Sequence, residues 1–143
     1  MRIAPSLTAL VFALGTAPAG AGDVVRGPVE AHVERVIDGD TLAAVAHVWP
    51  GHSVRVSVRI RGIDAPEMRS RCAAERAAAE AARQALEELV AGAPVLVANI
   101  GGDKYFGRVI ADVMVHDGRD AAAALAAAQH ARLYDGGRRA AYC

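Results

Sequence analysis

The sequence has little lysine, few aromatic residues and no excess charge. One lysine accompanies fifteen arginines, aromatic residues make up 4% of the chain, and the formal net charge is zero. Most nucleic-acid-binding proteins have a basic excess, so any affinity for phosphates must come here from locally placed arginines. Guanidinium groups suit this purpose because they bind phosphate bidentately. The five histidines are scattered, none at ligand spacing from another, and are expected to have structural or solvent-exposed roles.

Long hydrophobic runs are also missing, apart from a short one near the N-terminus. Residues 1–21 carry one basic residue, Arg2, then an apolar stretch at residues 7–14 and a run of small residues. This order predicts a secretory signal peptide. The alternative is a membrane anchor, but the apolar stretch is shorter than the roughly 20 residues that span a bilayer. We therefore expect residues 22–143 to form a single secreted or periplasmic domain, monomeric, without a stable protein partner and free of the membrane after processing.

Only two cysteines are present, Cys72 and Cys143. In an exported protein, an even number of cysteines indicates a disulfide. A bridge between them would close a loop of about 72 residues and contribute roughly 4 kcal/mol by chain-entropy arithmetic. The alternative is a pair of unpaired buried thiols. The two cysteines are too far apart in sequence to suggest a zinc site.

Hydrophobic patterning predicts five strands and two helices. The clearest strand is residues 53–61, where valine or isoleucine stands at every second position and arginine or serine between them. Further strands are expected at residues 28–37, 41–48, 95–100 and 108–115, and helices at 72–91 and 121–131. The fold class is therefore mainly β with helices (α+β). This order favours a five-stranded oligonucleotide-binding (OB) barrel, with one helix between strands three and four and another at the C-terminus.

Four acidic residues are expected at strand ends: Asp38, Asp40, Asp64 and Glu67. Each alone has a structural explanation, such as the hairpin turn that Asp38-Gly39 would form. Together they would repel one another unless a cation lay among them, and carboxylate and carbonyl oxygens favour calcium or magnesium. An EF-hand is excluded, because Leu42 and Ala43 stand where that loop requires a ligand and a glycine. A metal site would therefore be discontinuous.

Two arginines accompany these acidic segments. Arg59 lies five residues before Asp64, and Arg108 follows an Asp-Lys-Tyr-Phe-Gly stretch. A cation with two guanidinium groups suits phosphodiester cleavage, because negative charge accumulates on the phosphoryl oxygens in the transition state. A carboxylate that reaches a water molecule supplies the general base.

Three stretches resemble the signatures of the staphylococcal nuclease (thermonuclease) family. They are residues 36–42 (VIDGDTL), 58–67 (VRIRGIDAPE) and 103–108 (DKYFGR), in the family's order and at similar separations. The resemblance covers residues 29–133, and the tail from residue 134 is similar to exported bacterial members. It implies a calcium-dependent nuclease that cuts DNA or RNA at the 5′-oxygen side of phosphorus.

The resemblance also implies a set of metal ligands. Asp40 and Asp64 would bind Ca²⁺ through their carboxylates, and Ala65 through its backbone carbonyl. The family usually has threonine at the position of Ala65, but a backbone ligand tolerates alanine. Asp38 would support the metal-binding loop from behind.

The catalytic and substrate-binding roles follow in the same way. Arg59 and Arg108 would clamp the scissile phosphate, while Glu67 would orient or deprotonate the attacking water. Tyr105 and Tyr134 would line the nucleotide pocket, where stacking on an aromatic ring contributes about 1–3 kcal/mol per base.

One departure and two alternatives accompany this interpretation. Phe106 is inserted between Tyr105 and Gly107, where the family has Tyr-Gly-Arg, so a different loop around Arg108 is anticipated. The main alternative function is a non-catalytic OB-fold module that binds oligonucleotides, because a fold does not fix a function. The other is a secreted domain in which calcium serves stability alone.

Overall fold

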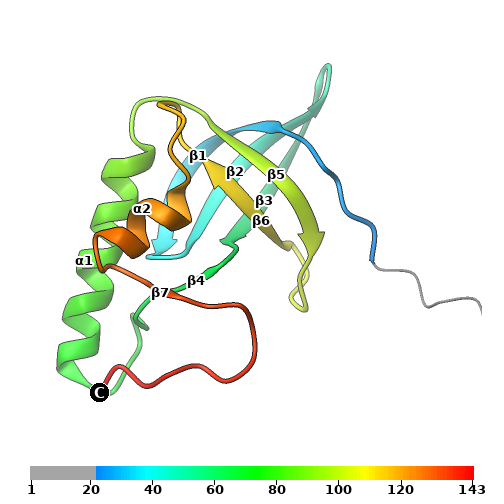
Figure 1. Cartoon of the computed structure of the whole chain (residues 1–143). Coiled ribbons are helices and arrows are strands. Elements are labelled where there is room, and N and C mark those ends of the chain that lie inside the picture. Colours follow the sequence, from blue (N-terminus) through cyan, green and yellow to red (C-terminus); the bar gives the residue numbers. More distant parts are fainter. Residues whose placement is uncertain (1–21) are drawn as a thin grey trace, which may run out of the picture.

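The computed structural model describes residues 22–143, so the predicted signal peptide at 1–21 lies outside the described residues (Figure 1). Five strands form a closed barrel in the spatial order β1-β2-β3-β6-β5. The barrel strands are β1 (Val29–Asp38), β2 (Thr41–Trp49), β3 (His52–Ile60), β5 (Val95–Gly102) and β6 (Arg108–Met114). Helix α1 (Ala73–Val90) precedes β5, and α2 (Ala121–Ala127) follows β6. The predicted α+β class and the five-stranded OB-type barrel are confirmed.

The barrel closes through one parallel pair, β3 with β6, while its other neighbouring strands are antiparallel. The parallel register places Ser57 opposite Arg108, two residues before Arg59. Laterally paired residues share a face of a sheet, and Val58 between them points into the barrel. Arg59 and Arg108 therefore leave the same outer face of the barrel, near one another.

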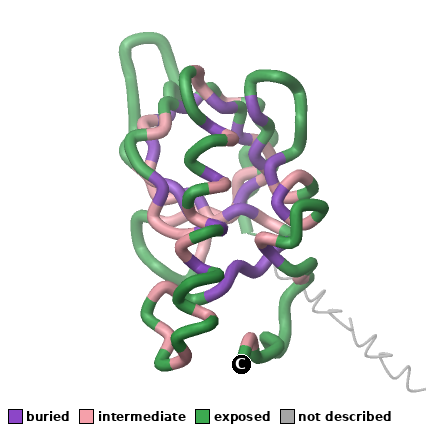
Figure 2. Tube along the Cα trace, turned by 90° about the vertical axis from the view of Figure 1, so that its left-hand side faces the viewer, coloured by how far each residue is buried: buried purple, intermediate pink, exposed green. Residues whose placement is uncertain are grey.

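Small and medium-sized apolar side chains fill the interior. The barrel buries Ala31, Val36, Leu42, Ala44, Val58, Ile60, Val95, Val97, Ala111 and Val113. Helix α1 lies against β1 and α2 (Figure 1). Its buried side chains share one face at helical spacing and are Ala79, Ala82, Leu86 and Val90. Figure 2 shows the buried residues gathered at the centre, with the C-terminal segment largely exposed. Among residues 22–143, neither helix is long and apolar enough to cross a membrane.

Gly39, in the turn between β1 and β2, allows this helix to come very close. A Cβ atom at position 39 would lie 2.6 Å from the Cβ of Ala82 and 2.9 Å from the Cβ of Ala65. The absence of a side chain at Gly39 thus fixes the distance between α1 and the turn that carries Asp38 and Asp40.

We expect Gly39→Ala to lower the free energy of unfolding by about 1–3 kcal/mol, the usual cost of an added methyl group in a packed site. Urea unfolding measures the change. Gly102→Ala is the matched control, because a Cβ there meets no atom within 4 Å and the backbone is not left-handed. Equal urea midpoints for the two variants would show that α1 yields easily and that the close approach is unimportant.

Both helices have side-chain caps at their N-termini. The Sγ atom of Cys72 accepts a hydrogen bond from the Glu75 N–H, and Oδ1 of Asp120 accepts one from the Ala123 N–H at 2.8 Å. The second helix therefore begins at Ala121, the first residue of the helix predicted at 121–131. Cys72 lies just before the first helical residue and was included in the helix expected at 72–91.

The second helix ends at Ala127, four residues before the predicted end. The chain leaves it through Gln129, whose φ is +61°. The His130 N–H donates to the Leu125 carbonyl at 2.9 Å and the Gln129 N–H to the Ala126 carbonyl at 3.1 Å. This is a Schellman-type ending, which usually has glycine at the left-handed position. Because glutamine occupies it here, the sequence gives no stop signal.

Two short strands lie outside the barrel, β4 (Ile63–Asp64) and β7 (Arg132–Leu133), paired antiparallel. They were not predicted, since two residues are too few to show alternation. The pair joins the segment after β3 to the start of the C-terminal tail, residues 134–143. Figure 1 shows this tail passing below the barrel and returning to the start of α1.

A disulfide links Cys72 to Cys143, as predicted. The tail is also held by the Tyr142 hydroxyl, which donates to the Asp64 carbonyl at 2.6 Å. The Arg132 guanidinium lies 3.8 Å from the centre of the Tyr142 ring. The tail is therefore fixed both covalently and by side-chain contacts.

Removing this disulfide with the double substitution Cys72→Ser, Cys143→Ser is expected to lower the free energy of unfolding by about 2–4 kcal/mol. The physical reason is that the bridge spans 71 residues of sequence and restricts the unfolded chain. Urea unfolding of the oxidised protein and the variant measures the loss. A reductant should bring the wild-type midpoint to that of the variant and leave the variant unmoved; a wild type insensitive to reductant would contradict the prediction.

Candidate active site

One pocket of about 350 Å³ collects residues from all three of the signature stretches. Its lining is Asp38, Asp40, Thr41, Arg59, Glu67, Asp103, Lys104, Tyr105, Arg108, Ile110, Tyr134 and Arg139. Seven of the predicted site residues are in this set. Two others, Asp64 and Ala65, are buried behind it, 3% and 2% exposed. The fold thus brings together segments that are up to about a hundred residues apart.

Two buried carboxylates face Arg59. Oδ2 of Asp40 lies 3.2 Å from Nη1 of Arg59, and Oδ1 of Asp64 lies 3.7 Å from Nη2. The Asp40 carboxylate also accepts hydrogen bonds from the Ala65 N–H at 2.8 Å and the Thr41 hydroxyl at 2.9 Å. These contacts fix the Asp40 carboxylate between the turn after β1 and the segment after β4.

The protein groups alone do not fully satisfy the two acids. Burial raises the pKa of Asp40 to about 6, and Asp38 adds to this rise while Arg59 opposes it. The buried Oδ1 of Asp64 meets the geometry of no hydrogen bond within residues 22–143, and its close contact is an ionic one with Nη2 of Arg139 at 2.5 Å. An all-oxygen set of two carboxylates and the Ala65 carbonyl fits a hard cation such as Ca²⁺ or Mg²⁺.

Arg59 is held rigidly at the end of β3. Its Nη1 donates to the Ile60 carbonyl at 3.1 Å and its Nη2 to the Ile63 carbonyl at 2.9 Å. Gly62 makes the intervening turn with a φ of +88°. The guanidinium is therefore preorganised at the pocket wall, and its side chain is only 18% exposed.

Arg108 enters the same pocket from the start of β6. Its Nε pairs with the Asp103 carboxylate, and its guanidinium lies 4.4 Å from the centre of the Tyr105 ring. Burial opposes the charge of Asp103, but the hydrogen bonds from Arg108 and the Lys104 N–H outweigh it and lower the pKa of Asp103. The inserted Phe106 lies in the loop before β6 with its side chain fully exposed. The insertion is accommodated outward, and Arg108 still faces the pocket.

A second hollow, of about 530 Å³, adjoins the first and shares Arg59, Ile110 and Tyr134 with it. Ile60 and Ile63 add further apolar lining. The Tyr134 hydroxyl donates to the Gly137 carbonyl at 2.8 Å, which fixes the ring at the border of the two hollows.

Arg139 lines the pocket, although no role was predicted for it. Its Nη1 pairs with the Glu67 carboxylate, while its Nη2 lies 2.5 Å from Oδ1 of Asp64 and 3.3 Å from the Ala65 carbonyl oxygen. The available signal was indirect. The predicted bridge from Cys143 to Cys72 would bring the tail back to a position a few residues from Glu67.

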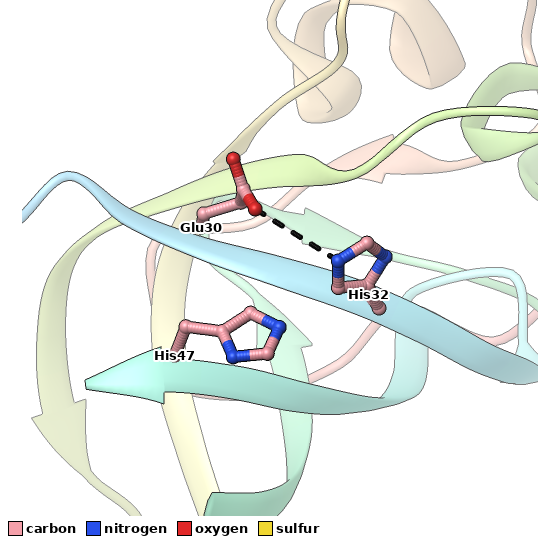
Figure 3. A group of neighbouring side chains, drawn as sticks. All are labelled: Glu30, His32 and His47. Atoms are coloured by element: carbon pink, nitrogen blue, oxygen red, sulfur yellow. Dashed lines mark ion pairs between the residues drawn. The ribbon is translucent and has the colours of Figure 1, made fainter. Parts of the chain in front are cut away.

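Two of the histidines, which were not expected to lie near one another, form a cluster with a glutamate. His32 and His47 are distant in sequence, but the pairing of β1 with β2 brings them together with Glu30 on the barrel surface (Figure 3). One potential ligand atom from each of the three residues lies within 4.8 Å of the others. The cluster lies apart from the pocket of Asp40 and Asp64, since no residue of it lines that pocket.

OB-type barrels commonly bind oligonucleotides, and guanidinium groups around a pocket can stabilise charge on phosphoryl oxygens. Residues 57–141 match the model of the family described as staphylococcal nuclease homologue. The chain belongs to this family. The match begins after Asp38 and Asp40, so the fold alone places those two acids in the pocket. No curated protein matches the chain.

Proposed function

We propose that this protein is a calcium-dependent nuclease that hydrolyses phosphodiester bonds of DNA or RNA. The observation that carries the proposal is the meeting of Asp40 and Asp64 with Arg59, Arg108 and Glu67 around one pocket. A protein that only bound oligonucleotides would have no need for buried acids that repel both each other and the phosphate. This argument favours catalysis over the binding module.

Asp40, Asp64 and the Ala65 carbonyl would hold the calcium ion, with Asp38 supporting the loop. The Asp40 N–H donates a hydrogen bond to Oδ1 of Asp38 at 3.2 Å, and this contact is consistent with Asp38 holding the metal-binding loop in place. When bound, the ion supplies positive charge that offsets the charge developing on the phosphate and polarises the P–O bond.

The chain's own groups would carry the remaining chemistry. Glu67, with a side chain 53% exposed at the pocket, would take a proton from the attacking water. The water oxygen then bonds to phosphorus as the bond from phosphorus to the 5′-oxygen breaks, and the departing 5′-oxygen takes up a proton from solvent. Arg59 and Arg108 would donate hydrogen bonds to the phosphoryl oxygens as their charge grows. Because Arg59 is already held by two backbone carbonyls, little reorganisation is needed.

Nucleotide recognition would use the adjoining hollow. Tyr134 lines both this hollow and the phosphate pocket, and Tyr105 lines the phosphate pocket alone. Stacking on these rings tolerates any base, since every base has a π-face. Residues 1–21 would direct export, and the disulfide is compatible with a secreted or periplasmic monomer.

The decisive experiment is incubation of the purified protein with denatured DNA, in Ca²⁺ or in EGTA. Shortening of the DNA with calcium and none with EGTA is expected, with new ends that carry 3′-phosphates. A gel shift in the same buffers separates the alternative, because a binding module would retard the DNA without shortening it at any calcium concentration. Intact DNA with calcium would contradict the proposed activity.

A further inference from the structure

Arg139 contacts the groups that the proposed function assigns to calcium and to the attacking water. Its Nη2 is 2.5 Å from Oδ1 of Asp64 and 3.3 Å from the Ala65 carbonyl oxygen, and its Nη1 pairs with Glu67. A guanidinium cannot share these oxygen atoms with a divalent ion, because both need the same lone pairs and the two positive charges repel.

The tail that carries Arg139 cannot move far from the pocket. Four residues beyond it, Cys143 is bonded to Cys72, and Tyr142 donates to the Asp64 backbone carbonyl. On its other side, the ring of Tyr134 is attached to the tail by the hydrogen bond to Gly137. A charged group tethered at both ends has a high effective concentration at its target.

We propose that Arg139 is a tethered cation that competes with calcium for Asp64 and Ala65, so that the C-terminal tail sets the metal affinity of the site. The inference rests on the metal ligands assigned under the proposed function. Calcium binding then requires the guanidinium to leave Oδ1 of Asp64 and the Ala65 carbonyl. Arg139 can retain its pair with Glu67, which lies nearer to solvent and is not assigned to the metal.

The test is isothermal titration of the protein with Ca²⁺ alone, without nucleic acid. If Arg139 occupies the ligands in about 90% of molecules, Arg139→Ala should bind calcium about tenfold more tightly, because the binding-competent fraction rises from a tenth to nearly all. Arg139→Lys should give an intermediate affinity, since lysine keeps the charge but cannot contact both acids with one planar group.

Arg138→Ala is the matched control. Arg138 is the neighbouring exposed residue of the same charge, and no hydrogen bond or ion pair of its side chain occurs within residues 22–143. Its removal should change the affinity less than about twofold, because exposed charges are strongly screened. Freeing the tail with Cys72→Ser, Cys143→Ser should tighten calcium binding in the same direction as Arg139→Ala.

Unchanged or weaker calcium binding by Arg139→Ala would overturn the inference, and so would equal effects of the Arg138 and Arg139 substitutions. The DNA assay separates the two proposals. Tighter calcium binding by Arg139→Ala without any DNA cleavage would reject the nuclease and keep the competition. DNA cleavage by the wild type, together with an unchanged calcium affinity in Arg139→Ala, would keep the nuclease and reject the competition.

The surface cluster carries a second and independent inference. Nε2 of His32 lies 3.8 Å from Oε1 of Glu30, and the rings of His32 and His47 meet edge to face at 5.1 Å between centres (Figure 3). Nδ1 of His47 is hydrogen-bonded to the Ser53 hydroxyl at 2.9 Å, which leaves its Nε2 free. Such a hydrogen bond on the second ring nitrogen is usual for metal-binding histidines.

We infer that Glu30, His32 and His47 form a surface site for Zn²⁺ or a similar late transition-metal ion. Two imidazoles and a carboxylate suit such an ion, whereas the all-oxygen pocket suits calcium. Glu30 and His32 are two residues apart and so share a face of β1. Because Ala31 pairs with Ala46 and His32 with Val45, His47 lies opposite Glu30 and diagonal to His32. The ligands thus come from two strands whose pairing fixes their spacing.

Titration with Zn²⁺ in the presence of saturating Ca²⁺ tests this site. We expect one Zn²⁺ to bind, with affinity lowered by about tenfold or more in His47→Ala and in His32→Ala, since each loses one of three ligands. His52→Ala is the control, an exposed histidine at the start of β3 outside the cluster. Equal zinc binding by the wild type and His47→Ala, or none by the wild type, would overturn the assignment.

Discussion

Replacing Glu67 with glutamine is expected to reduce turnover by about 10²–10⁴-fold, the usual contribution of a general base. Glutamine has nearly the same shape but cannot accept a proton from water. Because the Glu67 side chain lies at the surface of the pocket and is not among the assigned calcium ligands, fold and calcium binding should persist. The rate of DNA shortening at saturating substrate and calcium measures the loss.

Glu88→Gln is the control for this substitution. Glu88 is an exposed carboxylate on α1, outside the pocket of Asp40 and Arg59, and its change should leave the rate within about twofold, as usual for exposed positions. Near-normal turnover in Glu67→Gln, with calcium binding intact, would remove Glu67 from its proposed role as base. A loss of calcium binding in the same variant would instead make Glu67 part of the metal site.

Arg59→Lys is expected to lower turnover by about 10²–10³-fold. This is the usual effect in enzymes of removing one preorganised hydrogen-bond donor to a developing oxyanion. A lysine keeps the charge but cannot contact Asp40, Asp64 and two backbone carbonyls with one planar group, as Arg59 does. The loss should appear mainly in kcat, since the missing hydrogen bonds matter most in the transition state. Steady-state kinetics on a short oligonucleotide would resolve kcat from KM.

The same strand offers a matched control in Arg55→Lys. Arg55 pairs with Glu34 on the barrel surface, and its side chain is 79% exposed. Surface ion pairs contribute little, so this variant should keep both stability and turnover. An equal loss of turnover in the two variants would mean that the charge of β3 as a whole, and not the position of Arg59, supports activity.

Much of the barrel could be predicted because its strands are long enough to show their period. The alternation over residues 53–61 placed β3 within one residue, and the alanine-rich stretch placed α1 equally well. Which strands pair to close the barrel, such as parallel β3 and β6, could not be predicted, because pairing leaves no pattern in the local sequence. Strands β4 and β7 could not be predicted for a different reason. Each has only two residues and is a strand only because it pairs with the other.

The candidate site was predictable where its residues form contiguous motifs. Asp40, Arg59 and Arg108 occur within stretches that resemble family signatures, and the fold brings them to one pocket. Arg139 lies in the tail, outside the three signature stretches, and only the path of the tail puts it beside Asp64. His32 and His47 lie on the paired strands β1 and β2. Their proximity depends on the register of this pair, which could not be predicted from the sequence.

The contact between Gly39 and Ala82 has a consequence for the lifetime of the pocket. With no room for even a methyl group between turn and helix, the segment that carries Asp38 and Asp40 and the middle of α1 are docked as one unit. Local openings of a protein involve such cooperative units rather than single residues. When α1 separates from the barrel, the turn that carries Asp38 and Asp40 loses the helix that packs against it. The pocket is therefore intact only while α1 is packed on the barrel.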